Sequence, residues 1–417
     1  MDKTASTPQA LRRTNLKAVL EVMRDAGAMT GTDLIEATGL TRATVIAVCD
    51  DLIRRGWVRE LEGDRSSGSQ KGRPARRFEF NASAGCVLGL DVGLATVTVL
   101  VAGLTGQMLG RAAERFSKTA DEAERRATIA RTADRALAEA GLPHSAVLAV
   151  GIGLSTAVDR HGNITKGLQL SEHFDIGLQT ELWQEHGWPV LLENDANLAA
   201  LGEHWRGVGA GVDDLAVMLA GERLGTGLIE SGRLLHGSNG GAGEVGTLEL
   251  VDGVGSQDGI ARLARHWGTA ALAEGKPTLI RDLVGPHTPR VSARFVFEAA
   301  AKDDPVAQEI LERIGRRMAR VISLLGTFLN PELVVIGGAV SASATALLPT
   351  INAELPRLTG TPPRVAVSEL GDAIVATGAV RLALAYVEDN ALALTPVGAG
   401  QGAGQGAGQG AGQGAGL

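Results

Sequence analysis

The stretch 71–77, Lys-Gly-Arg-Pro-Ala-Arg-Arg, follows a predicted helix-turn-helix and decides how the N-terminal part of the chain is interpreted. Between Arg65 and Arg77 there are five cations and no carboxylate. Arginine beside glycine and proline is typical of a flexible wing that lies against DNA phosphates or enters a narrow minor groove. We expect two strands, 57–61 and 77–80, to carry this wing. The stretch therefore predicts a winged helix-turn-helix that contacts double-stranded DNA.

Three helices are expected in front of the wing. Residues 10–26 carry apolar side chains at the i, i+3, i+4, i+7 spacing of one helix face. Either Thr30 or Thr32 can cap a second short helix, and Thr41 can cap a third, because a threonine hydroxyl accepts from the N–H groups of a first helical turn. The third helix begins with small and polar residues, which suit entry into a major groove about 12 Å wide. We therefore expect it to be the recognition helix.

The candidate DNA-binding residues lie at the start of the recognition helix, at its basic end and in the wing. They are Thr41, Arg42, Ala43, Thr44, Ile46, Ala47, Arg54, Arg55, Lys71, Gly72, Arg73, Pro74 and Arg76. The alternative is a solvated basic loop on a small protein–protein module. Charge favours DNA, because residues 1–80 hold fourteen Lys/Arg and eleven Asp/Glu, a net +3, whereas the whole chain is −7 and the remainder is therefore −10.

The composition of the chain limits the class of protein and the number of domains. The 417 residues are 44% hydrophobic, which is enough for two or three domains with sizeable cores. No apolar run reaches the roughly 18 residues of a membrane span, and the first residues lack a hydrophobic signal core, so we expect a cytoplasmic protein. Cys49 and Cys86 fall in a helix pattern and a strand pattern, which indicates buried thiols and no disulfide.

The C-terminal residues 398–417 repeat Gly, Ala and Gln with no large apolar side chain until the last position. Such a segment buries too little surface to offset the entropy of ordering it, so we expect a disordered tail from about residue 394. Silk-like β pairing is the alternative.

The body contains an internal repeat. Residues 87–102 and 215–231 each give a strand, a glycine-rich loop and a second strand. This is the plan of actin-like, ribonuclease H-like domains, in which two α/β lobes face a cleft and the two loops hold nucleotide phosphates through backbone N–H groups. The expected divisions are a winged helix at 1–80, a first lobe at 84–203, a second lobe at 204–390 and the tail at 394–417. Whether the last helix returns to the first lobe is left open.

Four motifs carry a resemblance to the ROK family of repressors, uncharacterised reading frames and sugar kinases. They are Asp91-Val92-Gly93, Glu193-Asn194-Asp195-Ala196-Asn197, Gly243-Glu244-Val245-Gly246 and Val335-Ile336-Gly337-Gly338, in family order. Each motif alone is weak, but four in order behind a winged helix are specific. The resemblance covers roughly residues 10–390 and includes a Gly-Arg-Pro wing like that of the family's repressor branch.

The resemblance implies a sugar site at the end of the strand predicted before Asn194. Asp195 occupies the position of the base that takes a proton from the sugar hydroxyl in family kinases. The implied ligand-binding residues are Ser155, Thr156, Asn194, Asp195, Glu244 and Thr247. Two structural alternatives are that Asn194 merely caps the following helix and that Glu244 forms a surface salt bridge.

Several family features are missing here. The family commonly has a zinc-binding histidine where this chain has Thr247, and residues 248–262 contain no cysteine or histidine, so we predict no metal site and no cofactor. A family glutamate near Ala261 is also lost. The phosphate loops are altered, since Leu94 and Ala95 replace a glycine and a threonine, and Glu222 would repel a triphosphate.

These observations lead to one hypothesis about function with two alternatives. We expect a transcriptional regulator, more specifically a repressor, that binds an inverted-repeat operator as a homodimer or homotetramer and senses a sugar or sugar phosphate. We expect no enzymatic activity. The first alternative is a ROK sugar kinase with an accessory DNA-binding head. The second is a regulator whose sugar cleft is a relic.

Overall fold

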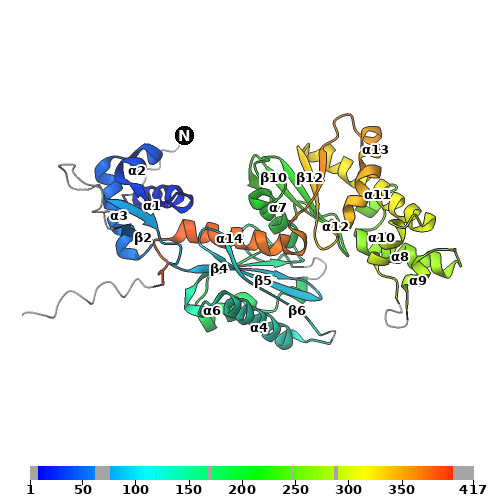
Figure 1. Cartoon of the computed structure of the whole chain (residues 1–417), viewed down its shortest axis with the longest axis horizontal. Coiled ribbons are helices and arrows are strands. Elements are labelled where there is room, and N and C mark those ends of the chain that lie inside the picture. The colour runs from blue at the N-terminus through cyan, green and yellow to red at the C-terminus, as the bar shows by residue number, and fades with distance from the viewer. Residues whose placement is uncertain are drawn as a thin grey trace, which may run out of the picture.

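The computed structural model describes residues 8–61, 76–117, 119–166, 171–246, 248–285 and 290–397. Lys71, Gly72, Arg73 and Pro74 of the wing, Thr247 and the repeat at 398–417 lie outside these ranges, so the expectations for them stay predictions. Figure 1 shows an N-terminal head beside one α/β lobe, with a second α/β lobe beyond it.

The head is a winged helix-turn-helix. Its elements are α1 (Pro8–Asp25), β1 (Met29–Thr30), α2 (Gly31–Thr38), α3 (Arg42–Arg55), β2 (Val58–Leu61) and β3 (Arg77–Phe80), and its sheet has the order β1-β3-β2. Thr30 caps α2 in a capping box with Asp33, and Thr41 caps α3. The three predicted helices and both wing strands are confirmed. The two-residue β1 is too short to leave a sequence pattern.

The first lobe is built on a five-stranded sheet with the order β6-β5-β4-β7-β8. Its strands are β4 (Cys86–Val92), β5 (Thr96–Gly103), β6 (Met108–Arg115), β7 (Val147–Leu154) and β8 (Val190–Asn194). The lobe also contains α4 (Glu122–Ala140), α5 (Ser171–Phe174) and α6 (Leu178–His186). The first three strands are antiparallel, whereas β7 and β8 run parallel to β4.

The second lobe repeats this topology in the order β11-β10-β9-β12-β13. Its strands are β9 (Leu215–Leu219), β10 (Gly225–Glu230), β11 (Arg233–Leu234), β12 (Leu333–Gly337) and β13 (Arg364–Val367). Its outer helices are α8 (Ile260–Ala273), α9 (Ile280–Leu283), α10 (Ala293–Ala300), α11 (Pro305–Leu329), α12 (Ser341–Ala344) and α13 (Leu348–Leu358). The predicted internal repeat and the actin-like fold class are confirmed.

Two helices, α7 (Asp195–Arg206) and α14 (Ile374–Asn390), pack against each other between the two sheets. Helix α14 packs on the first sheet so closely that a Cβ at Gly151 would lie 2.2 Å from the carbonyl oxygen of Ala379. Helix α7 packs on the second sheet, where a Cβ at Gly227 would lie 2.0 Å from the carbonyl oxygen of Ala196. The C-terminal helix therefore returns to the first lobe, as Figure 1 shows. The residue bounds given above for the lobes remain our proposal.

Cys49 and Cys86 are both buried and free, as predicted. Within the described ranges, no helix combines the length and the apolar character needed to cross a lipid bilayer.

Candidate DNA interface and ligand cleft

The N-terminal end of α3 presents one exposed face. Thr41, Arg42, Ala43 and Ala47 are exposed, and Thr44 and Ile46 are half-buried. The Thr41 hydroxyl accepts from the backbone N–H of Thr44 and lies 2.9 Å from the Thr44 hydroxyl. The opposite face, with Val45 and Val48, is buried in the core of the head. The structure therefore brings these six predicted residues together on a surface that can enter a major groove.

Arg54 and Arg55 lie at the other end of α3, roughly 18 Å from Arg42 along the helix axis. Both donate to the buried carboxylate of Asp51, at 2.8 Å and 3.2 Å. Arg55 also donates to the carbonyl oxygen of Leu392 at 2.8 Å, which lies beyond α14. The structure therefore does not bring these two arginines to the recognition face. The bond from Arg55 to Leu392 ties the head to the body, whereas Arg54 contacts only Asp51 of its own helix among the described residues.

Arg76 stands at the base of the wing, where three oxygens surround its guanidinium. It donates to Glu60 at 2.7 and 2.8 Å and to Asp50 of α3 at 2.8 Å, and it stacks over the ring of Phe78. In this arrangement Arg76 ties Glu60 of β2 to Asp50 of the recognition helix, so a phosphate contact would have to compete with two carboxylates.

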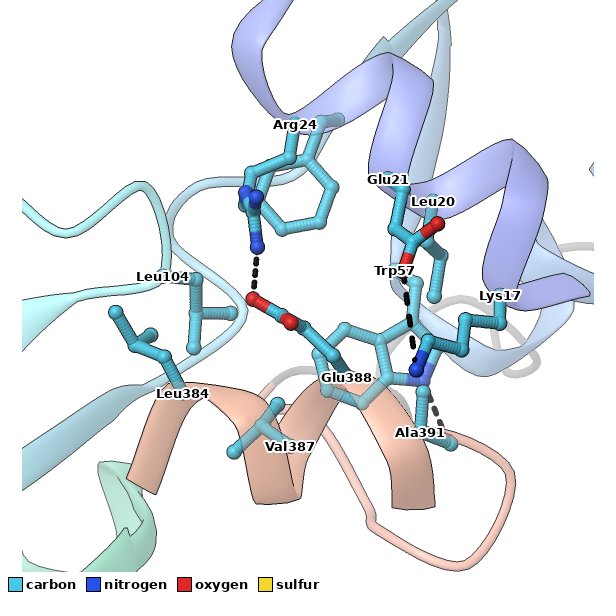
Figure 2. A pocket seen from close by; sticks show the side chains of 11 residues that line it. Lys17, Leu20, Glu21, Arg24, Trp57, Leu104, Leu384, Val387, Glu388 and Ala391 are labelled. Carbon is cyan, nitrogen blue, oxygen red and sulfur yellow. Dashed lines mark hydrogen bonds and ion pairs between the residues drawn. The ribbon is translucent and has the colours of Figure 1, made fainter. Parts of the chain in front are cut away.

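The head is joined to the body at the end of α14, as Figure 2 shows. The indole Nε1 of Trp57 donates to the carbonyl oxygen of Ala391 at 2.9 Å, and Arg24 of α1 forms an ion pair with Glu388. The cavity between them has a volume of only about 30 Å³, room for about one water molecule. This packed junction was not predicted, because its partners are more than 330 residues apart in the sequence.

Four of the predicted ligand residues, Ser155, Thr156, Asn194 and Asp195, meet where β7 and β8 end. The Ser155 hydroxyl donates to the Asp195 carboxylate at 2.5 Å. Burial raises the pKa of Asp195, and the bonds from Ser155 and the Ala196 N–H oppose this shift. Burial and the negative charges of Asp195 and Asp372 together raise the pKa of Asp91 to about 7, with burial the largest cause. The carboxyl groups of Asp91 and Asp195 thus lie close enough to interact electrostatically, and carboxylate oxygens can accept from hydroxyl donors.

Asn194 serves as the helix cap that was the structural alternative for it. Its side-chain oxygen accepts from the N–H groups of Ala196 and Asn197, and its amide donates to the carbonyl oxygen of Thr156. The Thr156 hydroxyl is buried and has no hydrogen-bond partner among the residues that the structure describes. Thr156 is therefore the ligand candidate here with unused polar capacity, whereas the amide of Asn194 is already engaged on both sides.

Glu244 reaches the cleft from the second lobe. It follows Gly243, whose backbone φ of +82° favours glycine and whose Cβ would lie 2.1 Å from the carbonyl oxygen of Thr226. Partial burial and the charge of Asp195 raise the pKa of Glu244, and Arg223 lowers it. Among the described residues no ion pair engages Glu244, so the surface salt bridge considered from the sequence is not observed.

A histidine–carboxylate pair beside the cleft was missed from the sequence. Nε2 of His236, just after β11, lies 2.7 Å from the buried Glu193 of β8. Glu193 also accepts from Asn197 and from the backbone N–H of Asn194. The pair joins the two lobes next to the candidate ligand residues. Its only sequence signal is that Glu193 is part of the same motif as Asp195.

The two glycine loops are held by arginines. Arg125 of α4 is buried and donates to the carbonyl oxygens of Gly93 and Leu94 in the first loop. Glu222 in the second loop accepts a bidentate pair from Arg265 at 2.7 and 2.6 Å, a partner not expected from the sequence. Within the described part of the chain, no group of three or more His, Cys, Asp or Glu side chains could hold a metal ion.

Comparison with known proteins places these parts in a family context. The model of the ROK family matches residues 87–386, and that of the IclR helix-turn-helix domain matches residues 16–62. The glucokinase of Halalkalibacterium halodurans is 30% identical over 280 residues, 63% of this chain and 83% of that protein. The xylose repressor of Caldicellulosiruptor bescii is 24% identical over 339 residues, 79% of this chain and 84% of that protein.

Among solved structures, a ROK family transcriptional regulator described as a homolog of the E. coli MLC protein superposes with a TM-score of 0.74. It is 21% identical, and the match covers 92% of this chain and 98% of that one. At this identity the match shows a shared fold, which includes both the head and the two lobes.

Proposed function

The chain belongs to the ROK family, and from that premise we propose that it is a DNA-binding transcriptional regulator, a repressor, whose kinase-like lobes sense a sugar or sugar phosphate. The observation that carries this proposal is the exposed N-terminal face of α3 on a winged helix fused to the ROK lobes. We place the protein in the cytoplasm, where its DNA and its effector would both be available.

The operator is an inverted repeat bound by a homodimer or homotetramer. Symmetric assemblies place two recognition helices about one DNA turn apart, so the half-sites should be spaced by about 10–11 bp or a multiple. Selection of bound duplexes from a random DNA library by the full-length protein tests this. A palindromic motif is expected, and recovery of no motif, with binding that depends only on salt, would count against the proposal.

Sugar sensing involves the hydroxyl-accepting groups at the cleft floor. Ser155, Thr156, Asp195 and Glu244 supply two hydroxyls and two carboxylates, the groups that neighbouring sugar hydroxyls need. Calorimetry with a panel of sugars and sugar phosphates tests the cleft. We expect at least one member of the panel to bind, and we expect Asp195→Asn to abolish that binding. If no member gives a heat of binding, the cleft does not sense these sugars and the relic alternative holds.

We propose that the protein is not a kinase. The Glu222 carboxylate lies in the second loop, where it would face a triphosphate, and Arg125 already binds carbonyls of the first loop. The Ser155–Asp195 contact and the glucokinase relative favour the competing proposal of a sugar kinase with a DNA-binding head. A coupled assay with ATP and the sugar panel decides between them, since turnover above roughly 1 s⁻¹ would be that of an ordinary enzyme.

A further inference from the structure

A second cavity, with a volume of about 440 Å³, lies outside the candidate sugar cleft. It is lined by the loop 159–162, by β8, by residues around β11 and by α14. None of the candidate ligand residues Ser155, Thr156, Asn194, Asp195 and Glu244 lines it. Its volume falls in the range of cavities that hold small metabolites, unlike the cavity at the head junction.

The walls of this cavity combine basic groups with an apolar surface. Arg160 reaches it from the first-lobe loop and Arg381 from α14, while Leu192, Leu234 and Leu382 supply apolar area. A guanidinium offers five donors in a planar fork that matches the geometry of an oxyanion. The lining therefore suits a ligand with an anionic head and an apolar body.

Two carboxylates also line the cavity, but both already accept donors within the protein. Asp159 accepts from the backbone N–H groups of His161 and Asn163 at 2.8 and 3.0 Å. Glu193 is held by His236 and Asn197, at 2.7 and 2.9 Å. The hydrogen bonds to both carboxylates weaken the repulsion that an incoming anion would meet, and for Glu193 a protonated His236 also offsets the charge.

We propose that this cavity is a second ligand site, which binds a small metabolite through a phosphate or carboxylate group held by Arg160 and Arg381. The site spans both lobes, because Glu193 belongs to β8 of the first lobe and Leu234 to β11 of the second. A ligand in this cavity would contact both lobes, through residues other than those of the candidate sugar site.

The position of Arg381 connects the site to the DNA-binding head. Its guanidinium lies 3.3 Å from Glu388, two turns further along α14. Glu388 is also the partner of Arg24 in α1, the contact drawn in Figure 2. An oxyanion beside Arg381 competes with Glu388 for the same guanidinium and so changes the charge that faces Arg24. This second step rests on the proposed function.

The binding step is tested without DNA. Crystals of the full-length protein soaked in sodium tungstate, a heavy analogue of phosphate, should show anomalous density between Arg160 and Arg381. In solution, calorimetry with inorganic phosphate should show affinity at least tenfold weaker in Arg160→Gln and in Arg381→Gln. Arg364→Gln is the matched control, because Arg364 pairs with Glu332 at 2.6 Å on the second lobe.

Two outcomes would overturn the site: no tungsten in the cavity, or phosphate affinity that is equal in all three variants and the unaltered protein. Circular dichroism melts show whether each variant is folded, and if Arg381→Gln alone fails to fold, Arg160→Gln decides.

The coupling between this site and the DNA-binding head, through Arg381 and Glu388, is tested by measuring operator affinity. At fixed ionic strength, phosphate should change the operator affinity of the unaltered protein at least threefold and leave that of Glu388→Gln unchanged. An unchanged affinity in both, with tungsten in the cavity, would overturn the communication step and leave the site. If no operator is found, the proposed function fails. The tungstate experiment still tests the second ligand site in that case, because it does not use DNA.

Discussion

His236 and Glu193 form a 2.7 Å contact that joins the two lobes beside the candidate ligand cleft. His236 comes from the end of the second-lobe hairpin, and Glu193 is buried in the last strand of the first lobe. Glu193 is followed directly by Asn194, the last residue of β8, and by Asp195, the first residue of α7. The contact therefore links the two lobes next to the candidate ligand residues.

This contact predicts a pH dependence of stability. The bond to Glu193 raises the pKa of His236 above its ordinary 6.5, against partial burial and Arg160, and Asp159 adds to the rise. A raised folded-state pKa means that the stabilisation is complete below about pH 6.5 and is lost as pH rises through the raised value. His236→Gln should therefore lower the free energy of unfolding by about 1 kcal/mol at pH 6 and by less at pH 8.5.

Urea unfolding at the two pH values measures this difference. His266→Gln, which alters an exposed histidine on α8 away from this contact, is the matched control. An equal loss at both pH values for His236→Gln would mean that the contact is a neutral hydrogen bond and not an ion pair.

The close packing of α7 on the second sheet makes a sharper stability prediction. A Cβ at Gly227 would lie 2.0 Å from the backbone oxygen of Ala196, which cannot move without shifting the helix. Gly227→Ala should therefore cost about 3 kcal/mol, at the upper end of overpacking effects. At Gly360, an exposed position, nothing lies within 4 Å of the added Cβ, so Gly360→Ala should change stability by less than about 0.5 kcal/mol. Comparable urea midpoints for the two variants would show that the sheet and helix separate easily.

The sequence predicts most of the fold because its signals are local. The Thr41 hydroxyl caps α3 by accepting from the N–H of Thr44, only three residues further along the chain. The two glycine hairpins are each contained in fewer than twenty residues. Ser155, Thr156, Asn194 and Asp195 also come together, since β7 and β8 are parallel and end at the same sheet edge.

What could not be predicted depends on partners distant in sequence. Arg55 and Arg76 belong to a basic pattern typical of DNA contacts, yet the structure engages one with Leu392 and the other with Glu60 and Asp50. Trp57 was placed in a strand, and its bond to Ala391 depends on how the last helix returns. A local pattern shows that an arginine is present but not which acceptor it finds.

The altered zinc segment predicts a metal-free protein. Residues 248–262 lack cysteine and histidine, and three or four such ligands are needed for a structural zinc site. Plasma emission analysis of purified full-length protein should give well below one zinc per chain, and chelator should leave the melting temperature unchanged. Tightly bound stoichiometric zinc would show that ligands come from elsewhere in the chain.

Arg42 and Arg73 should respond differently to removal, because they are expected to contact different parts of the DNA. Arg42 is exposed at the start of the recognition helix, so Arg42→Ala should weaken operator binding by about 1–3 kcal/mol and relax the sequence preference at one position. Arg73 lies in the wing outside the described residues, and Arg73→Ala should weaken binding to all sequences and reduce the salt slope by about one.

Fluorescence anisotropy from low to moderate salt separates the effects of Arg42→Ala and Arg73→Ala. Arg357→Ala, an exposed arginine on α13, is the control. If Arg73→Ala leaves both affinity and slope unchanged, the wing does not contact phosphates, and specificity must come from the helix face alone.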